Sequence, residues 1–126
     1  MPERPRIMVV DDQIGPRESI RMILKPDYEV TTAESGEAAL ESLPTFRPDL
    51  VFMDIKMLTL DGVEVLRRIK AQDPSIEVVM ITAHASLETV KSALTHGAFE
   101  YLIKPFNKKD LEETVRRALN RRREQL

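Results

Sequence analysis

Four short apolar runs and one weaker run recur along the chain, separated by stretches in which apolar residues return every three or four positions. Short apolar runs are typical of buried strands, and the longer period is typical of helices that pack on them. The predicted strands are Ile7–Val10, a weak second strand over Val30–Ala33, Leu50–Met53, Val78–Ile81 and Tyr101–Ile103. This alternation predicts an α/β fold with a doubly wound, five-stranded parallel sheet.

Prolines and capping residues mark the bounds of the helices between these strands. Pro26, Pro44 and Pro74 each follow a helical stretch and are expected to end it, because proline cannot continue a helix. The residues placed to cap the later helices are Ser35, Asp61 (with Glu64 at capping-box spacing), Ser86 and Asn107. In the fourth helix, Leu87, Val90 and Leu94 share one apolar face.

Reactive polar side chains stand at the ends of four of the strands. Asp11 and Asp12 follow the first strand, and Asp54 follows the third. Thr82 and Lys104 follow the fourth and the fifth. Because the carboxyl ends of parallel strands meet at one edge of a sheet, we expect these side chains to converge. Three carboxylates, a hydroxyl and an ammonium can together hold a hard divalent cation and a phosphoryl group.

Each of these side chains has an ordinary interpretation when it is taken alone. Aspartates after a strand often bond the backbone of a turn, and a threonine or lysine at a strand end is commonly solvated. The functional interpretation rests on their joint occurrence, since independent accidents would have to fall on the same edge of one sheet. His84 and His96 show no spacing typical of a zinc site, and we interpret them as surface residues.

The residues at these strand ends form four motifs. They are Val9-Val10-Asp11-Asp12, Met53-Asp54-Ile55-Lys56-Met57 leading to Asp61-Gly62, Ile81-Thr82-Ala83, and Lys104-Pro105-Phe106. Together they resemble the receiver domain of two-component response regulators, over a stretch from about Arg6 to Leu119. The resemblance implies a flavodoxin-like (βα)5 fold with sheet order 2-1-3-4-5. One departure is Leu58, which stands where the family often has proline.

The resemblance also implies a function and a role for each site residue. The function is that of a phosphorylation-controlled signalling switch, which accepts a phosphoryl group from a phosphohistidine of a sensor histidine kinase or phosphotransfer protein. The implied roles are Asp54 as phosphoacceptor; Asp11, Asp12, Asp54 and the Lys56 backbone carbonyl as Mg²⁺ ligands; Lys104 as phosphoryl-binding residue; Thr82 and Tyr101 as switch residues; and Lys56 and His84 as residues that tune self-dephosphorylation. The bond between Lys104 and Pro105 is expected to be cis.

Two other functions fit parts of the pattern. An Asp-nucleophile, Mg²⁺-dependent phosphatase or phosphotransferase acting on small molecules also uses carboxylates, a metal and a lysine on a doubly wound sheet. Such enzymes usually carry a second catalytic carboxylate two residues after the nucleophile on the first strand, and Gln13 stands there. A receiver fold kept only as a binding surface is disfavoured because every phosphorylation group is present. In the leading interpretation the domain is no conventional enzyme but catalyses its own phosphorylation and slow self-dephosphorylation.

Length, charge and cysteine content narrow the picture further. At 126 residues the chain is long enough for one domain with its own core, which we place at about residues 6–119, with a basic helix end or linker at 120–126. The net charge of −2 argues against direct nucleic-acid binding. The absence of cysteine fits a cytoplasmic setting, and the N-terminal apolar stretch is too brief for a membrane span or a signal peptide.

Two features are expected to carry the output. One is a homodimer face formed by the fourth helix, the fifth strand and the fifth helix, where the mixed charges of Lys91, Glu100 and Arg116 suit reciprocal pairing. The other is the end of the last helix. Leu119 and Leu126 are one heptad apart, so the helix can continue into a fused output domain after Leu126.

Overall fold

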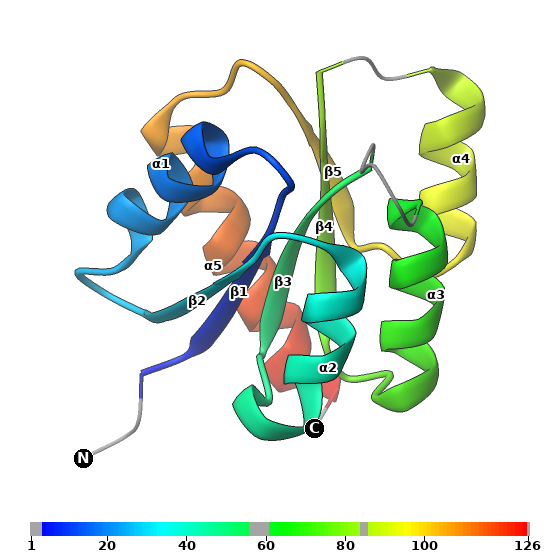
Figure 1. Cartoon of the computed structure of the whole chain (residues 1–126), viewed down its shortest axis with the longest axis horizontal. Helices are drawn as coiled ribbons and strands as arrows, with labels where there is room; N and C mark the ends of the chain where they lie inside the picture. The colour runs from blue at the N-terminus through cyan, green and yellow to red at the C-terminus, as the bar shows by residue number, and fades with distance from the viewer. Residues whose placement is uncertain (1–3, 56–60, 84–85, 126) are drawn as a thin grey trace.

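A computed structural model describes residues 4–55, 61–83 and 86–125 of the chain, in which five strands alternate with five helices (Figure 1). The elements are β1 (Arg6–Val10), α1 (Ile14–Leu24), β2 (Glu29–Ala33), α2 (Gly36–Phe46), β3 (Leu50–Asp54), α3 (Gly62–Gln72), β4 (Glu77–Thr82), α4 (Leu87–Thr95), β5 (Glu100–Ile103) and α5 (Lys108–Gln125). Each predicted strand is present, and so is each predicted helix.

The strands form one parallel sheet in the order β2-β1-β3-β4-β5, which confirms the predicted topology. The helices α1 and α5 cover one face of the sheet, and α2, α3 and α4 cover the other (Figure 1). In an open sheet of this order the chain adds β2 on one side of β1 and then β3, β4 and β5 on the other side, so the strand order reverses between β1 and β3. The carboxyl ends of these two central strands are therefore where a ligand site is expected.

Two apolar core layers hold the helices on the sheet. Alternate strand residues point to opposite faces, so β1 sends Met8 toward α2 and α3 but Ile7 and Val9 toward α1 and α5. The central strand β3 is fully buried from Leu50 to Met53. Each large aliphatic side chain buried in this way contributes roughly 1.5–3 kcal/mol to stability. The sheet is thus a rigid platform for the residues at its edge.

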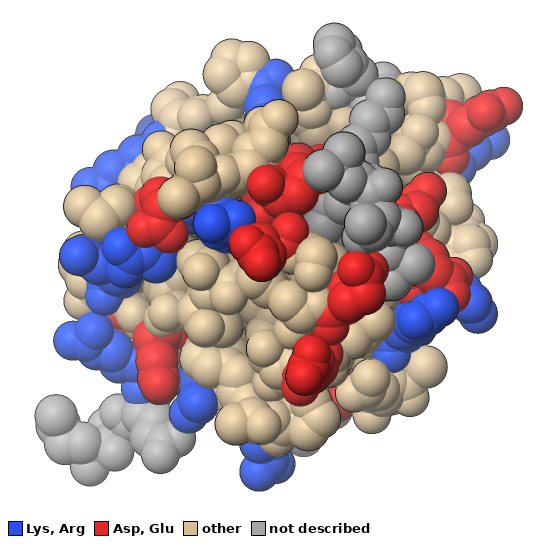
Figure 2. Space-filling view, in the orientation of Figure 1, with Lys and Arg blue, Asp and Glu red and all other residues tan. Residues whose placement is uncertain are grey.

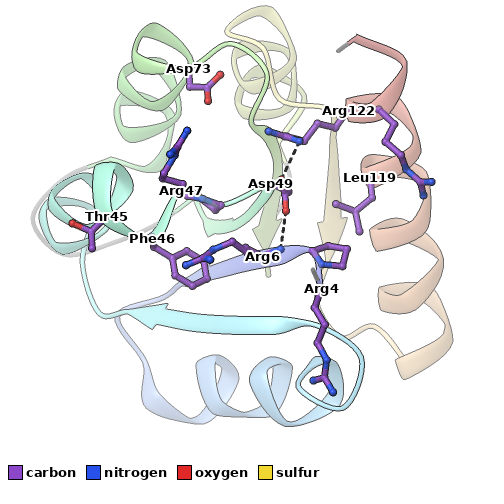
Figure 3. Close-up of a pocket in the computed structure, with 12 residues that line it drawn as sticks. Arg4, Arg6, Thr45, Phe46, Arg47, Asp49, Asp73, Leu119 and Arg122 are labelled. Atoms are coloured by element: carbon purple, nitrogen blue, oxygen red, sulfur yellow. Dashed lines mark hydrogen bonds and ion pairs between the residues drawn. The ribbon is translucent and has the colours of Figure 1, made fainter. Parts of the chain in front are cut away.

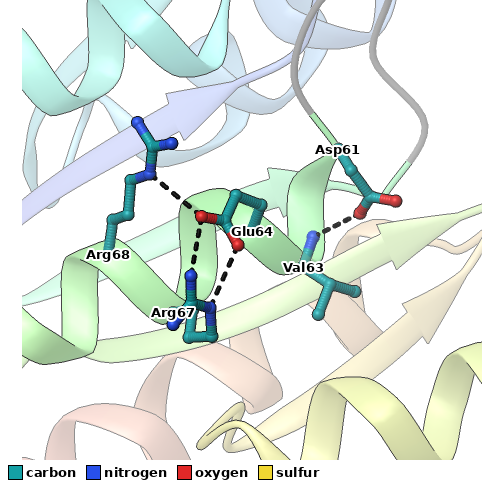
Figure 4. A network of polar contacts seen from close by, with 5 residues as sticks. All are labelled: Asp61, Val63, Glu64, Arg67 and Arg68. Carbon is teal, nitrogen blue, oxygen red and sulfur yellow. Dashed lines mark hydrogen bonds and ion pairs between the residues drawn. The ribbon is translucent and has the colours of Figure 1, made fainter.

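The predicted capping residues accept hydrogen bonds from the first turns of their helices. The bonds run to Ser35 Oγ from Ala38 N (3.1 Å), to Asp61 Oδ1 from Val63 N (2.7 Å), to Ser86 Oγ from Thr89 N (3.1 Å) and to Asn107 Oδ1 from Asp110 N (2.7 Å). Glu64 points forward along α3 to Arg67 and Arg68, so the expected reciprocal half of the capping box is replaced by ion pairs (Figure 4). The hydrogen bonds from Arg67 and then Arg68 lower the pKa of Glu64.

Two expectations about the helices were wrong. First, α2 continues two residues past Pro44 to Phe46, because a proline in the last turn costs one hydrogen bond without ending the helix at once. Second, of the predicted apolar face of α4 only Val90 packs inward, together with Ala93, whereas Leu87 and Leu94 are 72% and 46% exposed. The reason is position: α4 lies at the edge of the sheet, where the neighbouring strand β5 has only four residues (Figure 1).

None of the helices in the described part of the chain has the length and apolar character that a membrane crossing requires.

Candidate functional site

The carboxyl ends of β1, β3, β4 and β5 bring the predicted site residues together. Asp11 and Asp12 follow β1, Asp54 ends β3, Thr82 ends β4, and Lys104 follows β5. The pairing of neighbouring strands continues to their last residues, so the side chains that follow lie at one level of the sheet. Figure 2 shows acidic side chains gathered near the middle of this face of the molecule, with a basic side chain beside them.

The Lys104 ammonium lies between two of the carboxylates. Its Nζ atom is 3.3 Å from Asp11 Oδ2 and 3.3 Å from Asp54 Oδ2. Asp11 is almost completely buried, and a buried carboxylate is tolerated only when a cation or hydrogen-bond donors compensate its charge. Lys104, which follows the edge strand β5, supplies that compensation. The peptide bond between Lys104 and Pro105 is cis, as the resemblance implied.

Asp11, Asp12 and Asp54 form an acidic cluster. Each offers one carboxylate oxygen, and these oxygens all lie within 4.8 Å of one another. Three carboxylates this close repel one another, and a dication relieves the repulsion. Oxygen donors from carboxylates are the ligands that Mg²⁺ takes in proteins. The donor set therefore fits the predicted metal, with room in its coordination shell for other oxygens.

Main-chain contacts fix the position of Asp11. Its Oδ1 accepts a 2.9 Å hydrogen bond from the N–H of Gln13, and its own N–H donates to the carbonyl of Ala33 at 3.1 Å. Its carbonyl accepts a 3.0 Å bond from Arg17 Nη1. Arg17 was not predicted as a site residue. The only signal in the sequence was a basic residue in the helical turn after an acidic pair, which is too common to be informative.

Gly62 holds the start of α3 against the strand that carries Asp54. Its N–H donates a 3.0 Å hydrogen bond to the carbonyl of Ile55. A Cβ atom built on Gly62 would lie 2.5 Å from the carbonyl oxygen of Asp54 and 2.8 Å from Ile55 Cα, closer than real Cβ atoms approach. Only glycine fits here without displacing the main chain of Asp54. The motif contained this glycine, but its role becomes visible only when the two segments meet.

The two predicted switch residues lie on adjacent strands. Thr82 is buried, and its carbonyl accepts a 2.7 Å hydrogen bond from the N–H of Lys104. Tyr101 pairs with Met80 in the sheet and is half-buried. Tyr101 packs against the core layer under α2, α3 and α4, so its side chain is already partly buried in this structure.

Lys56 and His84, the residues predicted to tune self-dephosphorylation, lie outside the described residues, as does the Lys56 carbonyl predicted as a metal ligand. Their predicted roles stay predictions.

Comparison with known proteins places this site in a family. The sequence profile described as "Response regulator receiver domain" matches residues 7–116. The chain is 41% identical over 114 residues to "Transcriptional regulatory protein ZraR" of Escherichia coli, covering 90% of this chain and 26% of that protein. It is 34% identical over 115 residues to "Sporulation initiation phosphotransferase F" of Bacillus subtilis, covering 90% of this chain and 93% of that one.

Solved structures agree with the sequence matches. A receiver domain protein described as CheY-like, from Methanospirillum hungatei, superposes with a TM-score of 0.94 at 30% identity, over 98% of this chain and all of that one. The chain spans about a quarter of the length of several regulatory proteins it matches. These matches disfavour the small-molecule phosphatase considered above. The chain belongs to the response regulator receiver domains, which are phosphorylation-controlled switches of two-component signalling and interact with histidine kinases or phosphotransfer proteins.

Proposed function

We propose that Asp54 is the residue that accepts the phosphoryl group, with Asp11 and Asp12 as the ligands of a Mg²⁺ ion beside it. The observation that carries this proposal is the position of Lys104 Nζ, 3.3 Å from both Asp54 and Asp11, beside three carboxylates that lie within 4.8 Å of one another. Lys104, together with a metal ion that the three carboxylates would hold, would neutralise the charge of a transferring phosphoryl group.

Accessibility supports Asp54 over Asp11 as the acceptor. The side chain of Asp11 is 2% exposed, and its two oxygens are engaged by the Gln13 N–H and by Lys104. The side chain of Asp54 is 13% exposed and stands at the end of the central strand. A phosphohistidine must approach the attacking oxygen in line with the bond that breaks, and of these two carboxylates Asp54 is the one open to such an approach.

The transfer step can be assigned to atoms of this chain. A carboxylate oxygen of Asp54 attacks phosphorus, the phosphorus–nitrogen bond of the donor histidine breaks, and its electron pair returns to the imidazole. A bound Mg²⁺ supplies neutralisation of charge on the phosphoryl oxygens. Lys104, which pairs with Asp54 before transfer, pairs with a phosphoryl oxygen afterwards. The Thr82 hydroxyl then has an anionic oxygen to which it can donate a hydrogen bond.

We propose that the resulting movement of Thr82 and Tyr101 alters the face made of α4, β5 and α5, and that this face binds a second copy of the chain or another output partner. Leu87, Leu94 and Ile103 are exposed here, which supports an interface that buries apolar groups. Glu100, expected to pair across a dimer, is already bound by both Nη atoms of Arg117 in the same chain. The apolar residues are therefore better candidates than Glu100 for the contact itself.

The lifetime of the phosphoaspartate is part of the same proposal. We expect Lys56 and His84 to border the path of the hydrolytic water, and since neither is a carboxylate or amide suited to orient it, self-dephosphorylation is slow. A changed phosphoaspartate lifetime in Lys56→Ala or His84→Ala would support this assignment, and an unchanged lifetime in both would contradict it.

The absence of cysteine supports a cytoplasmic setting.

The acceptor is tested by mass spectrometry of the intact chain after incubation with acetyl phosphate and Mg²⁺. The wild type should gain one phosphoryl mass and Asp54→Asn none. Asp61→Asn is the matched control, because it removes a nearby exposed carboxylate while asparagine caps a helix as well as aspartate does. Stoichiometric labelling of Asp54→Asn, or equal loss in Asp61→Asn, would overturn the assignment.

A further inference from the structure

A polar cavity lies where the strands begin, at the opposite end of the strands from Asp54. We name it the basal hollow. It has a volume of about 770 Å³, and its lining includes Arg4, Arg6, Phe46, Arg47, Asp49 and Arg122 (Figure 3). The end of α2, the start of β1 and the last turns of α5 contribute these residues, so segments far apart in the sequence form it together. A cavity of this size can hold a small molecule.

Cationic groups outnumber carboxylates around the basal hollow. Five arginines line it, Arg123 being the fifth, and the carboxylates that line it are Asp49 and Asp73. Both carboxylates are already engaged. Asp49 Oδ2 accepts a hydrogen bond from the backbone N–H of Arg6 (2.8 Å), and Asp49 Oδ1 is paired with Arg122 Nη1 (3.0 Å). Ser75 binds Asp73 through its hydroxyl and its N–H, and the hydroxyl bond is the main reason that the pKa of Asp73 is lowered.

Several guanidinium groups keep unused hydrogen-bonding capacity. Among the described residues, no carboxylate lies within ion-pair distance of Arg4, Arg47 or Arg123, although Arg4 donates to the Lys25 carbonyl (3.4 Å) and Arg123 to Asn120 Oδ1 (3.2 Å). Arg6 pairs with Glu29 at 3.6 Å. The Nε atoms of Arg6 and Arg122 are buried and have no hydrogen-bond partner in the described part of the chain. The excess of guanidinium charge around one cavity would favour the entry of an anion.

Arg47 occupies a backbone position that disfavours it. It is the C-cap of α2, with φ of 55° and ψ of 65°, which is the left-handed conformation that helix ends usually give to glycine. Pro48 follows and restricts Arg47 further toward extended backbone. The conformation ends α2, with the Arg47 N–H donating to the Leu43 carbonyl, and it fixes where the Arg47 side chain begins. This conformation places the guanidinium of Arg47 along the wall of the hollow (Figure 3).

From these observations we infer that the basal hollow binds a small ligand that carries two or more linked phosphate groups. A guanidinium presents paired N–H donors that match phosphate oxygens. Arg47 comes from the end of α2, whereas Arg122 and Arg123 come from α5, so one diphosphate can contact guanidinium groups from both helices. Phe46 keeps Arg6 in place beneath it, since the Arg6 guanidinium lies 4.7 Å from the ring centroid.

The inference is tested by isothermal titration of the whole chain with sodium pyrophosphate, in a metal-free Tris buffer of low ionic strength. Omitting Mg²⁺ keeps the acidic cluster at Asp54 repulsive to the probe. The wild type should bind one equivalent, and Arg47→Gly should weaken binding about tenfold or more, as expected for loss of a charged hydrogen bond. Arg47→Gly should fold at least as stably as the wild type, because glycine accepts the left-handed conformation.

Controls separate this site from general attraction of anions. Arg68→Ala removes the same charge from an exposed position on α3 and should leave the affinity within about twofold. Amide chemical shifts should change at Phe46, Arg47 and Asp73. Unchanged affinity in Arg47→Gly, equal loss in Arg68→Ala, or shifts at Asp11 and Asp54 instead would each overturn the inference. Equal or tighter binding of a glutamate-rich peptide would overturn the choice of a phosphate ligand.

Discussion

The backbone N–H of Lys104 donates a 2.7 Å hydrogen bond to the carbonyl oxygen of Thr82, which joins the lysine of the acidic cluster to the predicted switch threonine through their main chains. The same two strands are paired to their ends, with Thr82 opposite Ile103. A displacement of Thr82 toward Asp54 therefore acts on the backbone that positions Lys104. The main chain therefore connects a change at Thr82 to β5.

Lys104→Met should destabilise the metal-free protein by about 1–3 kcal/mol, since Asp11 and Asp54 lose the cation between them and both are largely buried. Urea denaturation at neutral pH measures this. Mg²⁺ should restore more stability to the variant than to the wild type, because a metal ion can replace the missing positive charge. Lys108→Met, at an exposed position, should change stability by less than about 0.5 kcal/mol. A Mg²⁺ effect equal in both proteins would contradict the prediction.

Thr82→Ala should leave labelling of Asp54 intact but weaken the response to it. The hydroxyl has a charged phosphoryl oxygen to bind only after transfer, so its loss costs the active state about 1.5–3 kcal/mol. The measurement is self-association, by analytical ultracentrifugation, with beryllofluoride and Mg²⁺ as the phosphoryl mimic. Thr82→Ser retains a hydroxyl and should respond more strongly than Thr82→Ala. Equal responses of the two variants would show that the hydroxyl is not what couples acceptor and surface.

The parts of the fold that depend on local pattern were predictable, because apolar runs and capping residues act within one element. Ser35, Asp61, Ser86 and Asn107 cap the helices that they were expected to cap. The convergence of Asp11, Asp54 and Lys104 was also predictable, since parallel strands end on one edge. The first signal is a property of one strand or helix, and the second needs only the general geometry of a parallel sheet.

What the sequence could not show depends on how separate elements meet. Leu87 and Leu94 have helical spacing, but spacing does not reveal that their face of α4 lies beyond the edge of the sheet. Gly62 is recognisable as a turn residue, yet the contact that requires it involves a carbonyl eight residues earlier. The basal hollow arises from four distant segments, so no local pattern in the sequence brings its arginines together.

Gly62→Ala should be strongly destabilising, by about 2–4 kcal/mol, because the added methyl group would overlap the main chain of Asp54 and Ile55. Gly15→Ala is the matched control. Gly15 lies in α1, and among the described residues no atom outside its own helix turn lies within 4 Å of the corresponding Cβ, so this change should stabilise by roughly 0.5–1 kcal/mol through helix propensity. Thermal denaturation of both variants measures the contrast. Similar melting temperatures would mean that α3 can move away from β3 without cost.

The stability of the protein should carry a pH dependence that comes from Glu77, at the start of β4. Its side chain is 2% exposed, and Lys70 and Arg121 lie at 4.0 and 3.6 Å. Burial nevertheless raises the pKa of Glu77 above its ordinary value of 4.5, with Lys70 and Arg121 opposing the effect. Its Oε2 atom has no hydrogen-bond partner among the described residues, which is consistent with a carboxylate that the fold compensates incompletely.

The sign of the effect follows from proton binding. Below the ordinary carboxyl pKa, Glu77 is protonated whether the chain is folded or unfolded. Between that value and the raised pKa in the fold, only the folded state keeps the proton, so the free energy of unfolding falls as the pH rises through this window. Glu77→Gln cannot titrate. The unfolding free energy of the wild type minus that of Glu77→Gln, from urea denaturation between about pH 4.5 and about pH 7.5, should therefore decrease with pH. Taking this difference removes the contribution of Asp73, whose lowered pKa acts in the opposite direction in both proteins. A difference that stays level or grows with pH would show that Lys70 and Arg121 compensate the Glu77 carboxylate fully.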